Sequence, residues 1–286
     1  MRRRWHGAGF VVLALVWAAC GGAIDRPSSE PLKILITNDD GVDFPGISAL
    51  ADALSSLGTV TVAAPRENRS GSSHGVTSDK PIAVVESERQ GQKWFAIDAL
   101  PATCLRLAVE TLLPEKPDIV VSGINKGENL GTVTYYSATV AAAREAAFLG
   151  IPSIAVHLAA TKGMDYKAAA GITADIVRAV GKDGIPKGTF LNVNVPALSP
   201  DKIKGVRVTR QDTRAPVEIF EKTVSAEGAA EYKPSWKHHE PAGEDTDIWA
   251  VRNGYVSVSL FGYDQSAAAG TTARKSIKRL EKLAWK

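Results

Sequence analysis

Short apolar runs alternate with segments of helical hydrophobic spacing from Leu32 onward. Residues 33–37 (KILIT) and 59–65 (TVTVAAP) are apolar runs bounded by polar turns, which is typical of buried parallel strands. Between them, apolar residues recur at helical spacing: Ile47, Leu50, Leu54 and Leu57. Gly58 follows and is expected to end the helix. The chain therefore opens with a predicted strand, helix and strand.

The same alternation continues to about residue 200. Residues 80–87 and 93–99 predict a hairpin-like insertion, and residues 102–113 a helix. Buried strands are predicted at 117–125, 153–158 and 189–195, with helices at 139–149 and 166–180 between them. This order predicts an α/β fold: a mostly parallel sheet with helices on both faces and right-handed crossovers.

The rhythm breaks near Asp201, so we expect a core over residues 32–200 and a C-terminal appendage over 201–286. The appendage contains strands, long polar stretches and a basic tail, residues 271–286. An apolar stripe in that tail predicts a terminal helix that covers either a neighbouring subunit or its own body: Ile277, Leu280 and Leu283. We interpret the appendage as an assembly element.

The first residues have the pattern of an export signal. Arg2, Arg3 and Arg4 precede a short apolar run at 10–19 that ends in Ala18-Ala19-Cys20. We predict a signal peptide with a lipobox over residues 1–20 and a linker over 21–31, which implies an exported, lipid-anchored protein of the periplasm or outer membrane. Two alternatives stay open: a simple signal peptide with an incidental cysteine, and a wrongly assigned start codon upstream of a cytoplasmic enzyme.

The three N-terminal arginines also account for the whole formal net charge of +3. The rest of the chain is neutral, which argues against a binder of nucleic acid polymers.

The second cysteine, Cys104, lies in an apolar run and is therefore expected in the core. If Cys20 is lipidated, Cys104 has no partner for a disulfide.

Polar loops follow three of the predicted strands, at residues 38–41 (NDDG), 68–71 (NRSG) and 125–127 (NKG). If those strands are neighbours, the loops converge at the carboxyl edge of the sheet. Asp39 and Asp40 would then repel each other unless a cation lay between them. Ser70 and Asn125 supply further oxygen donors, and such a set suits Mg²⁺ or Mn²⁺ rather than zinc. The alternative interpretation of each residue is a helix cap or a turn.

The predicted helix at 139–149 opens with Ser137 and Thr139, so its N-terminus offers a phosphate site at the same edge. A cation together with a phosphate site favours phosphoryl chemistry. Residues 71–75 (GSSHG) match the letters G-x-S-x-G of a hydrolase elbow, but the required strand and helix do not flank them.

Four blocks in the same order resemble the signature segments of the SurE survival-protein nucleotidases: residues 34–50 (ILITNDDGVDFPGISAL), 62–73 (VAAPRENRSGSS), 117–131 (PDIVVSGINKGENLG) and 135–146 (YYSATVAAAREA). Segments 192–196, 206–214 and 245–259 are also similar to that family. The resemblance implies a Rossmann-like core, metal-dependent 5′- and 3′-nucleotidase activity on nucleoside monophosphates, and a C-terminal arm exchanged between subunits of a homodimer or homotetramer.

By the same resemblance, the metal ligands are Asp39, Asp40, Ser70 and Asn125, with Asp39 and Asp40 also catalytic. Asn38, Ser137 and Thr139 match the phosphate-site positions. Asp39 acts either as the nucleophile or as the base for a metal-bound water. The alternatives are a broader phosphatase or exopolyphosphatase, and a lipoprotein that binds nucleotides without turnover.

Three positions depart from the family pattern. Ala138 stands where glycine is usual, and it would distort the anion site if that position required a positive φ. Thr132 and Thr103 replace acidic residues. These departures bear on substrate preference and turnover.

Overall fold

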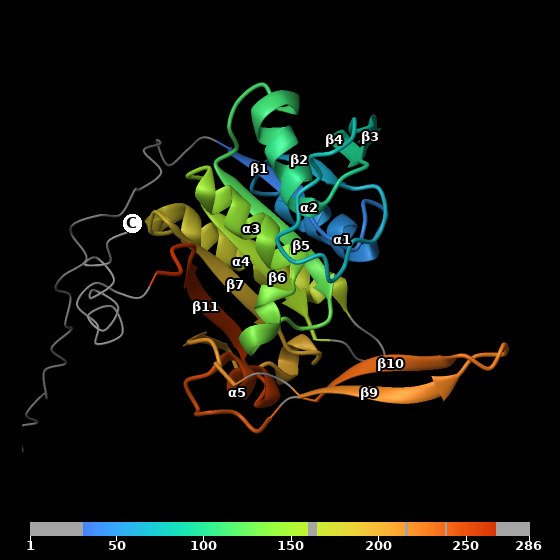
Figure 1. Ribbon diagram of the computed structural model, residues 1–286. Helices are drawn as coiled ribbons and strands as arrows, with labels where there is room; N and C mark the ends of the chain where they lie inside the picture. Colours follow the sequence, from blue (N-terminus) through green and yellow to red (C-terminus); the bar gives the residue numbers. More distant parts are fainter. Residues whose placement is uncertain (1–30, 160–164, 215–216, 238, 267–286) are drawn as a thin grey trace, which may run out of the picture.

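A nine-stranded sheet with helices on both faces forms the body of the protein in the computed structural model, which describes residues 31–159, 165–214, 217–237 and 239–266 (Figure 1). The strand order is β3-β4-β2-β1-β5-β6-β7-β11-β8. Strands β4, β2, β1, β5, β6 and β7 run parallel, whereas β3 and β11 are antiparallel to β4 and β7. The predicted α/β fold is confirmed.

The strands of the core are β1 (Leu32–Thr37), β2 (Gly58–Pro65), β3 (Val84–Arg89), β4 (Gln92–Ile97), β5 (Ile119–Lys126), β6 (Ser153–Leu158) and β7 (Thr189–Val195). The α-helices are α1 (Pro45–Leu54), α2 (Pro101–Leu107), α3 (Ala138–Phe148), α4 (Tyr166–Asp183) and α5 (Asp247–Arg252). A π-helical turn η1 (Ala108–Leu112) continues α2, and 3₁₀ turns η2 (Gly131–Tyr135) and η3 (Pro200–Lys202) complete the set.

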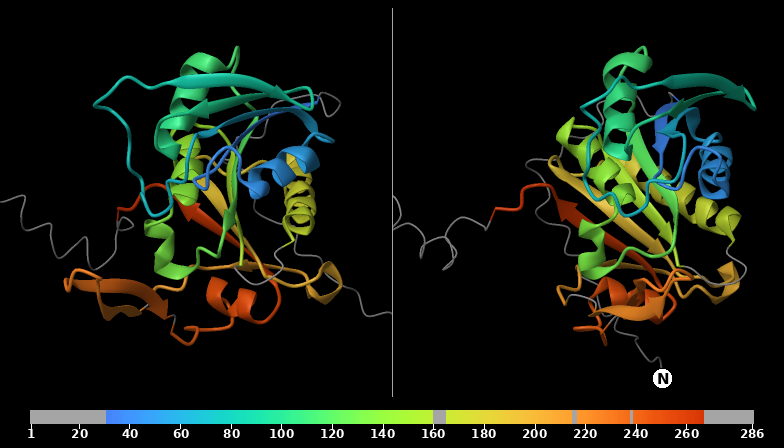
Figure 2. Two further views of the ribbon diagram at one scale, coloured as in Figure 1. Left: turned by 90° about the vertical axis from the view of Figure 1, so that its right-hand side faces the viewer. Right: turned by 45° about the vertical axis from the view of Figure 1, so that its right-hand side comes forward.

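Successive side chains of β1 enter different cores, as the period of two in a strand requires. Ile34 and Ile36 pack with α1 and α4 on one face of the sheet, whereas Leu35 packs with α2 and α3 on the other. Figure 2 (left) shows the sheet between these two helical layers. Cys104 is fully buried in the second core, as expected, and burial raises the pKa of its thiol to about 12.

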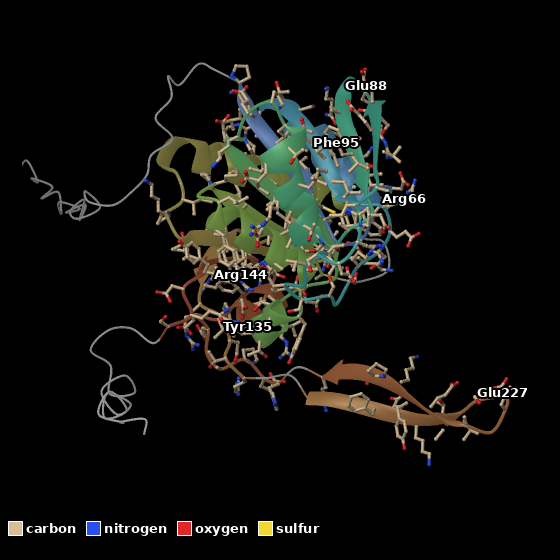
Figure 3. All side chains as sticks on the ribbon, turned by 45° about the horizontal axis from the view of Figure 1, so that its top comes forward. Arg66, Glu88, Phe95, Tyr135, Arg144 and Glu227 are labelled. Carbon is tan, nitrogen blue, oxygen red and sulfur yellow. The ribbon has the colours of Figure 1, made fainter. Side chains whose placement is uncertain are left out.

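The C-terminal segment is more closely joined to the core than the sequence suggested. It contributes β11 (Val256–Gly262), which pairs with β7, and β8 (Val206–Thr209), which pairs with β11. Within the described part of the C-terminal segment, the antiparallel hairpin of β9 (Val217–Val224) and β10 (Ala230–Lys237) extends away from the body (Figure 1). Figure 3 shows Glu227 at the far tip of this hairpin.

Both expected terminal elements, the export signal over 1–20 and the tail helix over 271–286, lie outside the described residues. Within the part of the chain that the structure describes, no helix is long and apolar enough to cross a membrane.

Candidate functional site

The three polar loops meet at one edge of the sheet. Strands β2, β1 and β5 are neighbours, and they are parallel, so the loops after them emerge side by side at their carboxyl ends. The sequence-based expectation of convergence is therefore confirmed.

Asn38 shapes the turn that carries the acidic pair. Its side-chain amide donates to the carbonyl of Gly41 (2.8 Å) and its oxygen accepts from the N–H of Gly41 (3.3 Å). Gly41 has φ +109°, and a Cβ there would lie 3.3 Å from the carbonyl carbon of Glu67. Only glycine adopts this conformation without strain. Asn38, expected at the phosphate site, thus also holds this turn, and the second N–H of its side-chain amide is not used in these bonds.

Asp39 is buried against the first turn of α3. The hydroxyl of Thr139 donates to Oδ1 of Asp39 at 2.5 Å, and the backbone N–H of Thr139 also bonds this carboxylate. Burial raises the pKa of Asp39, and the bonds from Thr139 offset this only in part. Thr139, predicted to bind phosphate, therefore orients Asp39, and its one hydroxyl proton is used for that purpose.

Asp40 faces the end of β5. Its Oδ2 accepts a hydrogen bond from the backbone N–H of Lys126 (3.1 Å). Burial, and after it the negative charge of Asp39, raise the pKa of Asp40 to about 6. The Asp39 carboxylate thus disfavours ionisation of Asp40, as expected for neighbouring acids in a partly buried site.

The Ser70 loop lies directly against this turn. The N–H of Arg69 donates to the carbonyl oxygen of Asp39 (2.7 Å), and the N–H of Ser70 donates to the side chain of Asn68 (2.7 Å). Ser70 itself is exposed. Among the described residues, its hydroxyl has no hydrogen-bond partner, so its oxygen is available to a ligand.

Asn125 reaches the same edge through an irregular strand end. The register of β5 against β6 shifts between Ser122 and Asn125, and Gly123 has φ +144° where a Cβ would lie 2.5 Å from the carbonyl of Val156. The amide nitrogen of Asn125 donates to the carbonyl of Gly127 (2.8 Å). That bond leaves the amide oxygen of Asn125 as the group available to a cation.

Helix α3 begins at this site. Ser137 is its N-cap, and its Oγ accepts from the N–H of Val140 (3.1 Å), which leaves the hydroxyl proton free to donate elsewhere. Ala138 is the first helical residue and is fully buried. Among described non-glycine residues, only Ser73 and Gln90 have a positive φ. The expected distortion at Ala138 is thus corrected: this position needs no left-handed backbone.

A buried polar network that sequence reasoning missed holds the next loop. Asn129 donates to Nδ1 of His157 (2.8 Å), and Nε2 of His157 bonds the side-chain oxygen of Asn192 (2.9 Å). Asn194 accepts from the N–H of Asn129 (2.9 Å). Burial lowers the pKa of His157 to about 3, so this histidine is a neutral structural link. Repeated asparagines in the apolar strand at 189–195 were its signal in the sequence.

The C-terminal segment also supports the site. Asp247, at the start of α5, accepts the N–H of Gly131 (2.7 Å) and the N–H of Asp212 (3.0 Å). Gln211 donates to the carbonyl of Gly131 and to Thr134 (2.9 Å each). The turn η2, which leads into Ser137, is therefore held by residues from the segment predicted to serve assembly.

The donors at this edge fit a hard divalent cation. They comprise two carboxylates, a hydroxyl and an amide oxygen. The carboxylates belong to Asp39 and Asp40, and Ser70 and Asn125 are the neighbours in sequence of Arg69 and Lys126, which hydrogen-bond to that acidic pair. Burial raises the pKa of both aspartates, and a cation bound beside them would favour their charged forms. Beside them, the N-terminus of α3 and the Ser137 hydroxyl offer donors to an anion.

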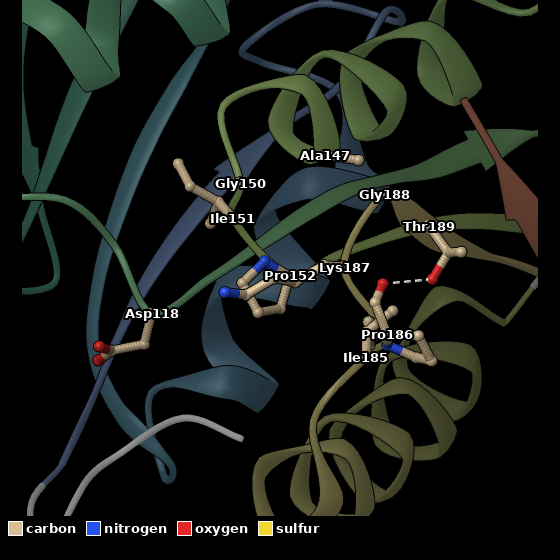
Figure 4. A pocket seen from close by; sticks show the side chains of 10 residues that line it. All are labelled: Asp118, Ala147, Gly150, Ile151, Pro152, Ile185, Pro186, Lys187, Gly188 and Thr189. Atoms are coloured by element: carbon tan, nitrogen blue, oxygen red, sulfur yellow. Dashed lines mark hydrogen bonds between the residues drawn. The ribbon is translucent and has the colours of Figure 1, made fainter. Parts of the chain in front are cut away.

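A separate pocket of about 280 Å³ lies at the opposite edge of the sheet. Figure 4 shows its lining by Asp118 before β5, by Pro152 before β6, and by residues 185–189 before and at the start of β7. These are the amino ends of the strands. The pocket is therefore remote from the acidic pair and has no part in the chemistry proposed for it.

Comparison with known proteins agrees with this geometry. The family model described as Survival protein SurE matches residues 34–218. The 5′-nucleotidase SurE of Natranaerobius thermophilus is 41% identical over 242 residues, which is 82% of this chain and 93% of that protein. The 5′-nucleotidase SurE of Aquifex aeolicus is 43% identical over 252 residues, 86% of this chain and 97% of that protein. The crystal structure of the SurE protein from Aquifex aeolicus superposes with a TM-score of 0.75 at 42% identity, over 87% of this chain and 99% of that one. The chain belongs to the SurE survival-protein family.

Proposed function

We propose that the protein is a metal-dependent 5′-nucleotidase that hydrolyses nucleoside monophosphates to nucleoside and phosphate. One observation carries the proposal: two carboxylates of raised pKa lie beside the N-terminus of α3, so a cation site adjoins an anion site. The relatives are 5′-nucleotidases by name, which supports it. Activity on 3′-monophosphates is part of the same proposal.

Asp39, Asp40, Ser70 and Asn125 would hold one Mg²⁺ or Mn²⁺. When bound, such an ion neutralises the phosphate and polarises the oxygen that attacks it. Thr139 fixes the Asp39 carboxylate through Oδ1, and Oδ2 then acts either as the nucleophile or as the base for the attacking water. The Ser137 hydroxyl and the first N–H groups of α3 bind the phosphate oxygens.

The regular start of α3 favours an enzyme over the alternative of a nucleotide binder without turnover. That alternative depended on a site weakened at Ala138 and Thr132, and of these Ala138 lies in ordinary helical geometry. A broader phosphatase, active also on short polyphosphate, is an outcome that a substrate panel distinguishes.

Replacement of Asp39 by asparagine tests the assignment. Asp39→Asn keeps the side-chain volume and removes a charge, so we expect kcat for AMP with Mn²⁺ to fall by at least about a hundredfold. Steady-state phosphate release measures this, with circular dichroism to verify folding.

Asp43→Asn is the matched control, because Asp43 is an exposed acid close by in the chain whose Oδ1 pairs with Arg89. We expect it to keep wild-type turnover. A folded Asp39→Asn protein with near-normal turnover would refute the site, and wild type without phosphate release from AMP would refute the function.

Homo-oligomer formation through the C-terminal region belongs to the same proposal. The hairpin β9–β10 presents exposed apolar side chains away from the body, among them Phe220, Val224 and Tyr232. Phe220 and Val224 share one face of β9, and Tyr232, opposite Lys222, lies on that face too. An isolated two-stranded hairpin is marginal in water, so this face favours a second copy of the chain as its partner.

A further inference from the structure

The loop that carries Ser70 has no regular secondary structure between β2 and β3, yet specific contacts fix it. Beyond the bond from Arg69 to Asp39, the N–H of Ser73 donates to the carbonyl of Tyr136 (3.1 Å) and its hydroxyl to the carbonyl of Tyr135 (2.6 Å). The next residue, His74, bonds through Nε2 to Oε2 of Glu145 at 2.8 Å. These contacts attach the loop to α3 and to the turn before it.

Glu145 is an unusual residue for its position. It lies in the middle of an alanine-rich helix, and its side chain is only 3% exposed. Burial alone would raise the pKa of Glu145, but the bonds from His74 and Arg106 lower it below its ordinary value, so the carboxylate is ionised. A buried charge is costly unless its partners are in place, and an apolar residue would pack here at less cost.

The two partners of Glu145 come from different parts of the molecule. Arg106 belongs to α2 and forms an ion pair with Oε1, whereas His74 belongs to the Ser70 loop and bonds Oε2. The ring of His74 also stacks on Phe148 of α3, with centroids 5.4 Å apart and planes 10° from parallel. Helix α3 therefore contacts His74 in two ways, by a hydrogen bond from Glu145 and by ring stacking on Phe148.

Helix α3 is thus attached to both halves of the proposed ion site. Thr139 in its first turn holds Asp39, and Glu145, six residues later, holds the Ser70 loop. The rise of 1.5 Å per residue sets these two attachment points about 9 Å apart along a rigid rod. The helix therefore contacts both a carboxylate of the proposed ion site and the loop that carries Ser70, in addition to the direct bond from Arg69 to Asp39.

We propose that Glu145 is a positioning residue that acts through His74 to hold Ser70 in place for the cation, and that this contact sets the affinity of the ion site. The inference rests on the proposed function. Removal of residues that orient metal ligands without contacting the metal typically changes metal affinity by about 10- to 100-fold. We assign His74–Glu145 that role here.

The test compares the two partners of the same carboxylate. In the metal-free full-length chain, the Kd for Mn²⁺ is measured by calorimetry without substrate, and the Tm is measured alongside. We expect His74→Ala to weaken Mn²⁺ binding by about tenfold, and His74→Gln, which keeps a donor near Nε2, to recover most of it. Arg106→Ala should lower the Tm and leave the Kd for Mn²⁺ at the wild-type value.

A second readout separates positioning from chemistry. At saturating Mn²⁺ and AMP, we expect kcat of His74→Ala within about twofold of wild type, with the loss confined to the Mn²⁺ concentration needed for half activity. If the His74–Glu145 contact were purely structural, His74→Ala and Arg106→Ala would instead change the Mn²⁺ requirement by the same amount.

Equal effects of His74→Ala and Arg106→Ala on the Kd, or a wild-type Kd in His74→Ala, would overturn this inference and leave the proposed function standing. Wild type that binds no Mn²⁺ would overturn the proposed function and this inference with it.

Discussion

Asp39 and Asp40 lie in surroundings that disfavour their own negative charge. Burial is the largest cause for both, and the charge of Asp39 adds to it at Asp40. Each still accepts a backbone hydrogen bond, which keeps the carboxylates oriented without fully compensating the burial. Binding of a cation would relieve this cost, so ligand binding and stability are coupled at this site.

The pH dependence of stability follows from that coupling. A carboxyl whose folded pKa is about 6, against 3.8 when unfolded, binds protons more tightly in the folded state. Its contribution to the free energy of unfolding therefore falls as the pH rises from about 4 to above 6. In EDTA, Asp40→Asn should raise the Tm at pH 8 by roughly 2–4 °C, with solvent screening of this partly exposed group taken into account.

Thermal unfolding at pH 4.5 and pH 8 checks this prediction. The gain in Tm should shrink at pH 4.5, because wild-type Asp40 is then largely neutral as asparagine is. Added Mn²⁺ should stabilise wild type at pH 8 more than the variant. A gain of the same size at both pH values would contradict the assigned titration.

Ala138 gives a second prediction at the scale of one residue. It is the first residue of α3, is fully buried, and needs no positive φ. Glycine there would remove a packed methyl group and loosen the helix start, at about 1 kcal/mol. Ala138→Gly should therefore leave kcat/KM for AMP within about twofold and lower the Tm by roughly 2–4 °C.

Steady-state kinetics and thermal melts measure both effects. A marked rise in kcat/KM would show that alanine crowds the phosphate site after all.

Much of the site was predictable from its residues, and the reason is geometric. Asp39 and Ser70 follow predicted buried strands and Asn125 ends one, and parallel neighbours bring such positions together. The side-chain contacts behind them were not predictable, because Thr139 is 100 residues from Asp39 and His74 is 71 from Glu145. A lone acid in the apolar pattern of an alanine-rich helix was the one signal that Glu145 gave.

At the scale of elements, the strands that the sequence placed correctly include the central ones, which are buried on both faces, and the predicted hairpin, which is β3–β4. β5 and β6 read as continuous apolar runs because helices cover both sides of the central sheet. β8 lies at the sheet edge with Val208 85% exposed, so its pattern carries little information about pairing. The sequence therefore suggested a separate appendage where the structure has a continuation of the sheet.

The hairpin β9–β10 yields a prediction about assembly. Phe220 is 56% exposed and Tyr232 is 58% exposed on one face of this element. If that face binds a second copy, Phe220→Ser with Tyr232→Ser should convert oligomer to monomer in light scattering. Lys233→Ser, on the other face of β10, is the matched control and should keep the wild-type mass.

An oligomer that survives the double substitution would count against the hairpin as the interface. Deletion of residues 271–286 tests the predicted tail helix in the same assay. Loss of the oligomer only in that deletion would move the contact to the tail.

At the scale of the whole molecule, we propose that the enzyme acts outside the cytoplasm on a lipid anchor. Arg2, Arg3 and Arg4, a short apolar run and Cys20 precede the first core strand, which begins at Leu32. Two or more acyl chains on Cys20 would hold the protein firmly at a membrane, and nucleotides outside the cytoplasm would be hydrolysed without depleting the cytoplasmic pool. Expressed in a Gram-negative bacterium, the full chain should fractionate with membranes, and its mass should show loss of residues 1–19 and a lipid on Cys20.

The control is Cys20→Ser. This variant should carry no lipid and should leave the membrane fraction or remain uncleaved, with AMP hydrolysis retained. Wild-type protein that stays soluble in the cytoplasm with its arginines intact would refute the location and leave the enzyme assignment untouched.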